Sequence, residues 1–223
     1  MKLRAPSAQL NQSGGALSQH DRPGSVIPLP LPEGDEALVA SLLARHPLAR
    51  GALFERHAPH VRRVLLRVLG LDQDIPDLLQ DVFVTALGSI GSLEDPRALR
   101  AWLTSIAVRH ARSLIRKRSR RRILSFIDGR ELDRHFAPAS PADLHEPVRA
   151  LYEVLKRMPA DERIAFALRF VDGMDLYEVA AACKVSRATV SRRLERARLR
   201  FLEEARRHEA LADWLNEGSR WTP

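Results

Sequence analysis

The hydrophobic positions of this chain recur at helical spacing, and no stretch shows the alternation of a β-strand. The clearest stripe falls at i, i+3, i+4, i+7, i+8, i+11 and i+12, and consists of Ile75, Leu78, Leu79, Val82, Phe83, Ala86 and Leu87. Weaker stripes predict helices over about 33–43, 53–69, 97–118, 147–158 and 161–171, with a kink or restart at Pro59. The pattern therefore predicts an all-α protein.

Residues 176–200 predict a helix-turn-helix. Asp175 and Glu178 have the spacing of a capping box before a short helix, Lys184 and Val185 form a turn, and Ser186 caps a second helix. That second helix buries one apolar stripe and carries many arginines off the stripe, as does a helix that enters the DNA major groove. The alternative is a solvated basic surface helix, which the agreement of turn, cap and charge disfavours.

Composition divides the chain into two small helical domains joined by a flexible linker. Residues 1–32 are rich in Ser, Pro, Gln and Gly and are predicted to be a disordered arm. Residues 33–122 form the first domain, 123–146 the linker and 147–205 the second domain with the helix-turn-helix. Residues 206–223 form a tail with no assigned role, which caps the second domain, binds a regulator or is disordered.

Positive charge is concentrated in two segments. Residues 97–122 carry +10 and residues 184–200 carry +6, and because the whole chain is +8, the remaining residues carry −8. Two basic segments in an otherwise acidic chain predict two contacts with nucleic acid. Along the first of them, Arg109, Arg112 and Arg116 lie at i, i+3 and i+7, a row that can follow a phosphate backbone.

Several other classes of protein are disfavoured. The single cysteine, Cys183, lies on an apolar helix side and is expected to be a core residue, and His57 and His60 alone do not make a metal site. No phosphate loop or nucleophile elbow is present, so we expect neither an enzyme nor a cofactor. No signal peptide and no membrane span are visible, so we expect a cytoplasmic protein.

Taken in order, four motifs resemble those of the extracytoplasmic-function (ECF) sigma factors, small bacterial sigma factors that have only domains 2 and 4. The motifs are Leu53-Phe54, DLLQDVF at 77–83, RAWLTSIAVRHARSLIRKR at 100–118, and YEVAAACKVSRATVSRRLERAR at 177–198. The resemblance covers roughly residues 36–122 and 147–205. It implies a protein that binds core RNA polymerase and promoter DNA, and the family commonly has an anti-sigma partner.

The resemblance also assigns residues to roles. It implies that the helix face with Asp77, Gln80 and Asp81 docks on the polymerase. Spacing alone favours a solvated acidic face. The resemblance implies contact with the −10 element by Arg109, Arg112, Arg116 and Lys117, with the loop 88–96 holding a flipped base. It implies contact with the −35 element by Arg187, Thr189, Ser191, Arg192, Arg193 and Arg196.

The chain departs from the family pattern at a few positions. His110 stands where Asn is common, Pro76 where Glu is usual, and Ala188 where Gly is common, while Ser191 and Arg192 replace a Lys-Ser pair. These changes leave the promoter sequence open. Two other functions would account for part of the pattern: a conventional helix-turn-helix regulator that binds an operator, and a helical RNA-binding protein. A conventional regulator would not need the docking helix, and an RNA-binding protein would not explain the helix-turn-helix.

Overall fold

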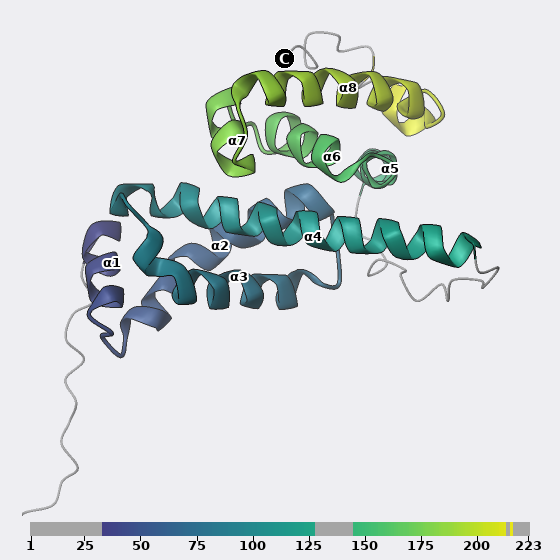
Figure 1. Cartoon of the computed structure of the whole chain (residues 1–223). Coiled ribbons are helices and arrows are strands. Elements are labelled where there is room, and N and C mark those ends of the chain that lie inside the picture. Colours follow the sequence, from purple (N-terminus) through teal and green to yellow (C-terminus); the bar gives the residue numbers. More distant parts are fainter. Residues whose placement is uncertain (1–32, 128–144, 213–214, 216–223) are drawn as a thin grey trace, which may run out of the picture. The chain divides into compact units, whose positions relative to one another are not determined.

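The structure, a computed structural model, describes residues 33–127, 145–212 and 215, and within these ranges it is helical with no strand. The all-α prediction is confirmed. The helices are α1 (Asp35–Leu43), α2 (Ala49–Leu69), α3 (Ile75–Ser89), α4 (Leu99–Ile127), α5 (Glu146–Lys156), α6 (Ala160–Phe166), α7 (Leu176–Cys183) and α8 (Arg187–Ala205) (Figure 1). Short turns of helix join them at η1 (Ile90–Ser92), η2 (Pro96–Ala98), η3 (Ala167–Val171) and η4 (Glu209–Leu211). The arm expected at 1–32, residues 128–144 of the expected linker, and Trp214 and Trp221 of the tail lie outside the described residues.

Helices α1 to α4 enclose the first part of the core. The α2 and α3 stripes meet there, and the rings of Phe54 and Phe83 lie 4.9 Å apart. Helix α2 is continuous through Pro59, where the sequence predicted a kink or restart. Pro59 lies on the exposed side of the helix, so water can satisfy the carbonyl of Glu55 that loses its donor.

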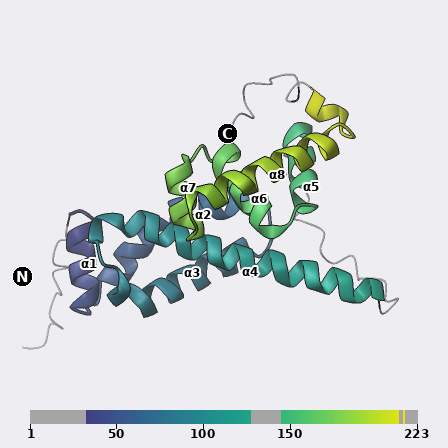
Figure 2. The same cartoon turned by 45° about the horizontal axis from the view of Figure 1, so that its top comes forward.

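Helix α4 is buried on two sides. The predicted side, with Leu99, Leu103 and Ile106, faces the first core. A second buried side carries smaller and more polar residues, namely Thr104, Ser105, Val108, Ala111 and Ile115. Helices α6 and α7 pack against α4, and α7 lies beside it in both views (Figures 1 and 2). Helix α4 also continues to Ile127, past the domain boundary expected at residue 122.

The second half of the fold is built around the helix-turn-helix. The Asp175 side chain accepts from the amides of Tyr177 and Glu178, and Glu178 returns the bond to the Asp175 amide, so the predicted capping box is present. Lys184 adopts the left-handed conformation at the turn, and the Ser186 side chain accepts from the Thr189 amide.

A second core cluster lies between α5, α6 and α8. The Phe166 and Phe201 rings are 4.8 Å apart in it. The start of the tail caps this cluster, because Leu211 of η4 is buried within it. Of the three roles open for the tail, the described residues therefore show capping.

Candidate nucleic-acid interface

The exposed face of α8 carries four of the six residues expected to contact the −35 element. Arg187, Ser191 and Arg192 are exposed and Thr189 is half-buried. The Arg187 guanidinium lies over the Tyr177 ring, 4.2 Å from its centroid. Such a cation–π contact restricts a long side chain that would otherwise be mobile. Tyr177 is not among the predicted site residues, although an aromatic residue just before a basic helix is a signal that could have indicated it.

The other two expected residues of α8, Arg193 and Arg196, contact a different part of the fold. Arg193 Nη2 lies 3.5 Å from Asp161 Oδ2, and Arg196 Nε donates to Glu162 Oε1 at 3.1 Å. Asp161 and Glu162 form the first turn of α6, and we call this pair the acidic turn. Arg200, one turn further along α8, also contacts it, with Nε 2.8 Å from Glu162 Oε2.

The basic row on α4 reaches the same acidic turn. Arg112 Nε lies 2.8 Å from Asp161 Oδ1, and Arg116 Nη2 donates to Asp161 Oδ2 at 2.9 Å. Arg109 and Lys117 are exposed and make no such contact. A surface hollow of about 560 Å³ follows this side of α4, lined by Arg109, Arg112, Ser113, Arg116, Ser119 and Arg120. The row is thus continuous, as predicted, but two of its members are engaged within the chain.

The acidic face of α3 points to solvent. Asp77, Gln80 and Asp81 are all exposed, while Leu78 and Val82 between them are buried. Val84, one turn beyond Asp81, is 63% exposed. This helix therefore presents two carboxylates and an amide next to an uncovered apolar side chain.

The segment expected as a loop at 88–96 contains more regular structure than predicted. Helix α3 extends to Ser89, η1 follows it, and the Asp95 side chain caps η2 by accepting from the Arg97 amide. His110, the residue found where Asn is common, is half-buried, and its Nε2 lies 2.9 Å from Thr85 Oγ1 on α3. Burial lowers the pKa of His110, so its imidazole is neutral at neutral pH.

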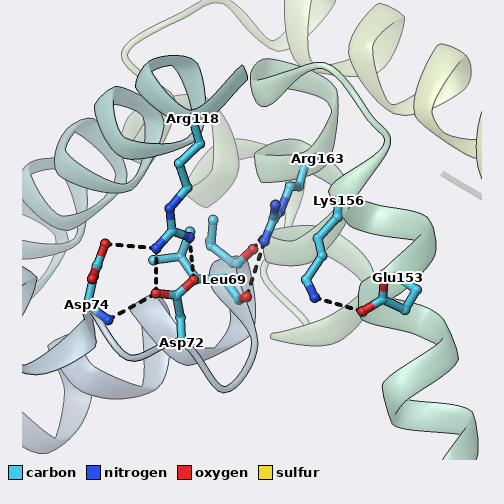
Figure 3. A network of polar contacts seen from close by, with 8 residues as sticks. Leu69, Asp72, Asp74, Arg118, Glu153, Lys156 and Arg163 are labelled. Carbon is cyan, nitrogen blue, oxygen red and sulfur yellow. Dashed lines mark hydrogen bonds and ion pairs between the residues drawn. The ribbon is translucent and has the colours of Figure 1, made fainter. Parts of the chain in front are cut away.

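Arg118 belongs to the basic segment by sequence but acts inside the fold. Its guanidinium donates to Asp72 Oδ2 at 2.5 Å and Oδ1 at 2.9 Å, and to Asp74 Oδ2 at 2.8 Å (Figure 3). Burial raises the pKa of the Asp72 carboxyl, but the hydrogen bonds from Arg118 and the Asp74 amide outweigh it and hold the pKa below 3.8. Arg118 therefore fixes the turn that precedes α3.

The described residues contain no His, Cys, Asp and Glu cluster able to hold a metal ion. Cys183 is buried as expected. Burial raises the pKa of its thiol above 9.0, although Arg112 and Arg193 are near enough to oppose the shift. In the same part of the chain, no helix has both the length and the apolar character needed to cross a membrane.

Two family models match the chain, sigma-70 region 2 over residues 53–121 and sigma-70 region 4 over residues 148–201. The two matches are in the order of the helices described above, with the acidic face and the α4 row in the first and the helix-turn-helix in the second. The chain belongs to the ECF group of sigma-70 factors. The resemblance seen in the sequence is confirmed, and as a sigma factor the protein directs transcription initiation.

Known sigma factors are similar over most of the chain. The ECF RNA polymerase sigma-E factor of Escherichia coli K12 is 25% identical over 175 residues, which cover 74% of this chain and 85% of that protein. The ECF sigma factor SigX of Bacillus subtilis 168 is 34% identical over 119 residues, covering 51% and 61% respectively. The solved structure of CnrH in complex with the cytosolic domain of CnrY matches with a TM-score of 0.55 and 25% identity, covering 78% of this chain and 99% of that one.

Proposed function

We propose that three helices of this sigma factor carry three separate binding surfaces. The exposed face of α3, with Asp77, Gln80 and Asp81, docks on core RNA polymerase. The α4 row, with Arg109, Arg112, Arg116 and Lys117, contacts the −10 element. Helix α8 contacts the −35 element through Arg187, Thr189, Ser191, Arg192, Arg193 and Arg196. The observation that carries the proposal is the presence of three separate polar helix faces, each opposite a buried side and each with several exposed members.

The proposed role is non-enzymatic and cytoplasmic. The protein supplies binding surfaces, and the polymerase performs the chemistry. We also propose a regulatory protein partner of the anti-sigma kind, because the similar CnrH chain is solved in complex with the cytosolic domain of CnrY. The −10 and −35 assignments are supported by the family matches, which place region 2 on α2 to α4 and region 4 on α5 to α8.

Run-off transcription with core polymerase tests the assignment of α3. Asp81→Arg should weaken core binding and initiation, because a basic surface on the polymerase would then meet a like charge, while folding should change by no more than about 0.5 kcal/mol. The matched control is Glu55→Arg, which makes the same charge change at an exposed position on α2. If both variants bind core as the unmodified chain does, α3 is not the docking helix.

Promoters varied in one element at a time test the two DNA assignments. Arg187→Ala or Arg192→Ala should change which −35 sequences are used, since an arginine that pairs with guanine discriminates by about 1–3 kcal/mol. Arg109→Ala should weaken open-complex formation on all promoters and reduce its salt dependence by a slope of about one. A changed −35 preference in Arg109→Ala would show that the elements are assigned to the wrong halves.

A further inference from the structure

The acidic turn of α6 joins both proposed DNA-binding helices. Asp161 contacts Arg112 and Arg116 of α4 and Arg193 of α8. Glu162 contacts two further arginines of α8, Arg196 and Arg200. Two carboxylates therefore engage five arginines from two helices, in the way that a pair of backbone phosphates would.

We propose that the structure is a closed, autoinhibited state of the sigma factor, in which the acidic turn stands in for promoter DNA on the α4 row. This inference rests on the proposed function, because it concerns regulation of the same arginines. Arg112 of the α4 row keeps only 21% of its side chain exposed, so a phosphate reaches it only after α6 moves away from α4. Arg187, Ser191 and Arg192 stay exposed. The closed state thus occupies Arg112 and Arg116 of the α4 row, while Arg109 and Lys117 of that row and the front of α8 stay accessible.

Other contacts hold the closed state together. The Tyr152 hydroxyl donates to the carbonyls of Leu66 and Arg67, and Arg163 donates to those of Val68 and Leu69. These four carbonyls are in the last turn of α2; the Gly70 amide donates to that of Leu66, and the other three lie beyond the last intrahelical donor. Side chains from α5 and α6 therefore complete a helix of the first half, which makes the closed state a specific packing.

Two further features strengthen this packing. Asp172, whose side chain is 5% exposed, lies 3.4 Å from Arg63 Nε and 3.8 Å from Arg67 Nε on α2. The apolar side of α7, with Val179 and Ala182, belongs to the same buried cluster as the second buried side of α4. Opening therefore exposes Val108 and Ala111 of α4 together with the α7 face.

The ionic contacts at the acidic turn are nevertheless incompletely satisfied. Arg112 Nη2 and Arg193 Nη1 are buried without a hydrogen-bond partner, and the oxygens Asp161 Oδ1 and Glu162 Oε2 meet their arginines without hydrogen-bond geometry. A half-satisfied buried polar cluster is weak, and its five arginines outnumber its two carboxylates. A partner that offers more acceptor oxygens, such as a nucleic-acid backbone, can therefore compete for it.

The cluster is also accessible from solvent. A cavity of about 640 Å³ lies where α4 meets the α5–α6 turn, and Arg116, Asp161 and Arg200 are among the residues that line it. Much of the remainder of its wall is basic, with Arg121, Arg122 and Arg157 among the lining residues. An approaching phosphate meets this positive wall first and then the Arg116–Asp161 pair. It can therefore reach Arg116 from solvent and compete with Asp161 for it.

The test removes the negative charges of Asp161 and Glu162 while it keeps the shapes of both side chains nearly unchanged. In the full chain, Asp161→Asn with Glu162→Gln should bind a single-stranded −10 non-template oligonucleotide about tenfold more tightly than the unmodified protein, without polymerase, since several partly exposed ion pairs are lost together. Small-angle scattering should show a larger radius of gyration. The control removes two exposed carboxylates elsewhere, Glu203→Gln with Glu209→Gln, and should leave both values unchanged. Equal oligonucleotide affinity in all three proteins would overturn the proposal.

A trapped form makes the result independent of how well the charge variant folds. Arg116→Cys and Asp161→Cys, in a Cys183→Ala background, are joined by a short bismaleimide. The joined protein should bind core polymerase but lose open-complex formation at least about tenfold relative to the same protein before reaction. If the joined form opens promoters normally, the closed state is not inhibitory. If the unmodified protein never supports initiation, the proposed function fails instead, so the two failures are distinguishable.

Discussion

His60 should make the first half of the fold sensitive to acid. Its Nε2 lies 2.8 Å from Thr104 Oγ1 on α4, and the Thr104 hydroxyl already donates to the Arg100 carbonyl. His60 Nε2 must therefore carry the hydrogen and donate. The other nitrogen, Nδ1, then accepts from Arg63 Nη2 at 3.4 Å. Protonation of Nδ1 would place a second positive hydrogen against this guanidinium.

The size of the effect follows from the pKa. Burial, followed by the charges of Arg100 and Arg63, lowers the pKa of His60 from 6.5 to about 4. Between these two values the unfolded chain binds a proton that the folded chain does not, so stability is full above pH 6.5 and is lost as the pH falls towards 4. At pH 5 the two pKa values give a loss of about 2 kcal/mol, which solvent screening of this half-exposed ring reduces to about 1 kcal/mol.

Urea unfolding at pH 7.5 and pH 5.0 measures this loss. His60→Gln keeps a neutral nitrogen donor near the Thr104 hydroxyl and cannot be protonated in this range. The variant should therefore lose about 1 kcal/mol less stability between the two pH values than the unmodified protein. The same variant assigns the His60 signal in an NMR titration, where the apparent pKa should be near 4. An apparent pKa near 6.5, or equal pH dependence in both proteins, would refute the reasoning.

Three further perturbations have definite expectations. Gly70→Ala should destabilise the fold by about 2–3 kcal/mol in thermal unfolding, because Gly70 has φ +78° and an added Cβ would lie 3.0 Å from the Tyr152 ring. Arg118→Ala should cost about 2 kcal/mol, since two partly buried carboxylates lose their partner, and urea unfolding against an Arg118→Lys control should show partial rescue by the lysine. Tyr177→Ala should weaken −35 duplex binding about two- to fivefold by releasing Arg187, whereas Tyr177→Phe should not, and retention of full affinity by the alanine variant would count against the contact.

The helices and their caps could be predicted from sequence because their signals are local. The capping box at Asp175, the cap at Ser186 and the stripe of α3 all depend on residues within a few positions of one another. The second buried side of α4 could not be predicted in this way. Thr104 and Ser105 resemble surface residues by type, yet they are buried on a helix that packs against α2 and α3 and also against α6 and α7.

The same limit applies to the charged residues of the site. Periodicity placed Arg109, Arg112 and Arg116 in one row, and the structure has that row. It could not distinguish an arginine that faces solvent from one that binds a carboxylate of the same chain, because the acidic residue comes from another helix. Arg118 and Arg163 differ most from solvent-facing arginines. Arg118 binds Asp72, and Arg163 is only 6% exposed.

Closure and DNA binding are linked through the population of the open state. If only a fraction of molecules is open, the apparent dissociation constant for the −10 element is the intrinsic constant divided by that fraction. A closed form favoured by about 2.7 kcal/mol leaves roughly 1% open and weakens DNA binding about a hundredfold. The two ion pairs from the α4 row to Asp161, the donors on the end of α2 and the apolar α7 contact together are sufficient for a bias of this size. Any partner that binds the open form more tightly than the closed one therefore raises DNA affinity, and the maximum gain equals the cost of opening, of which the charge variant of the acidic turn measures the ionic part.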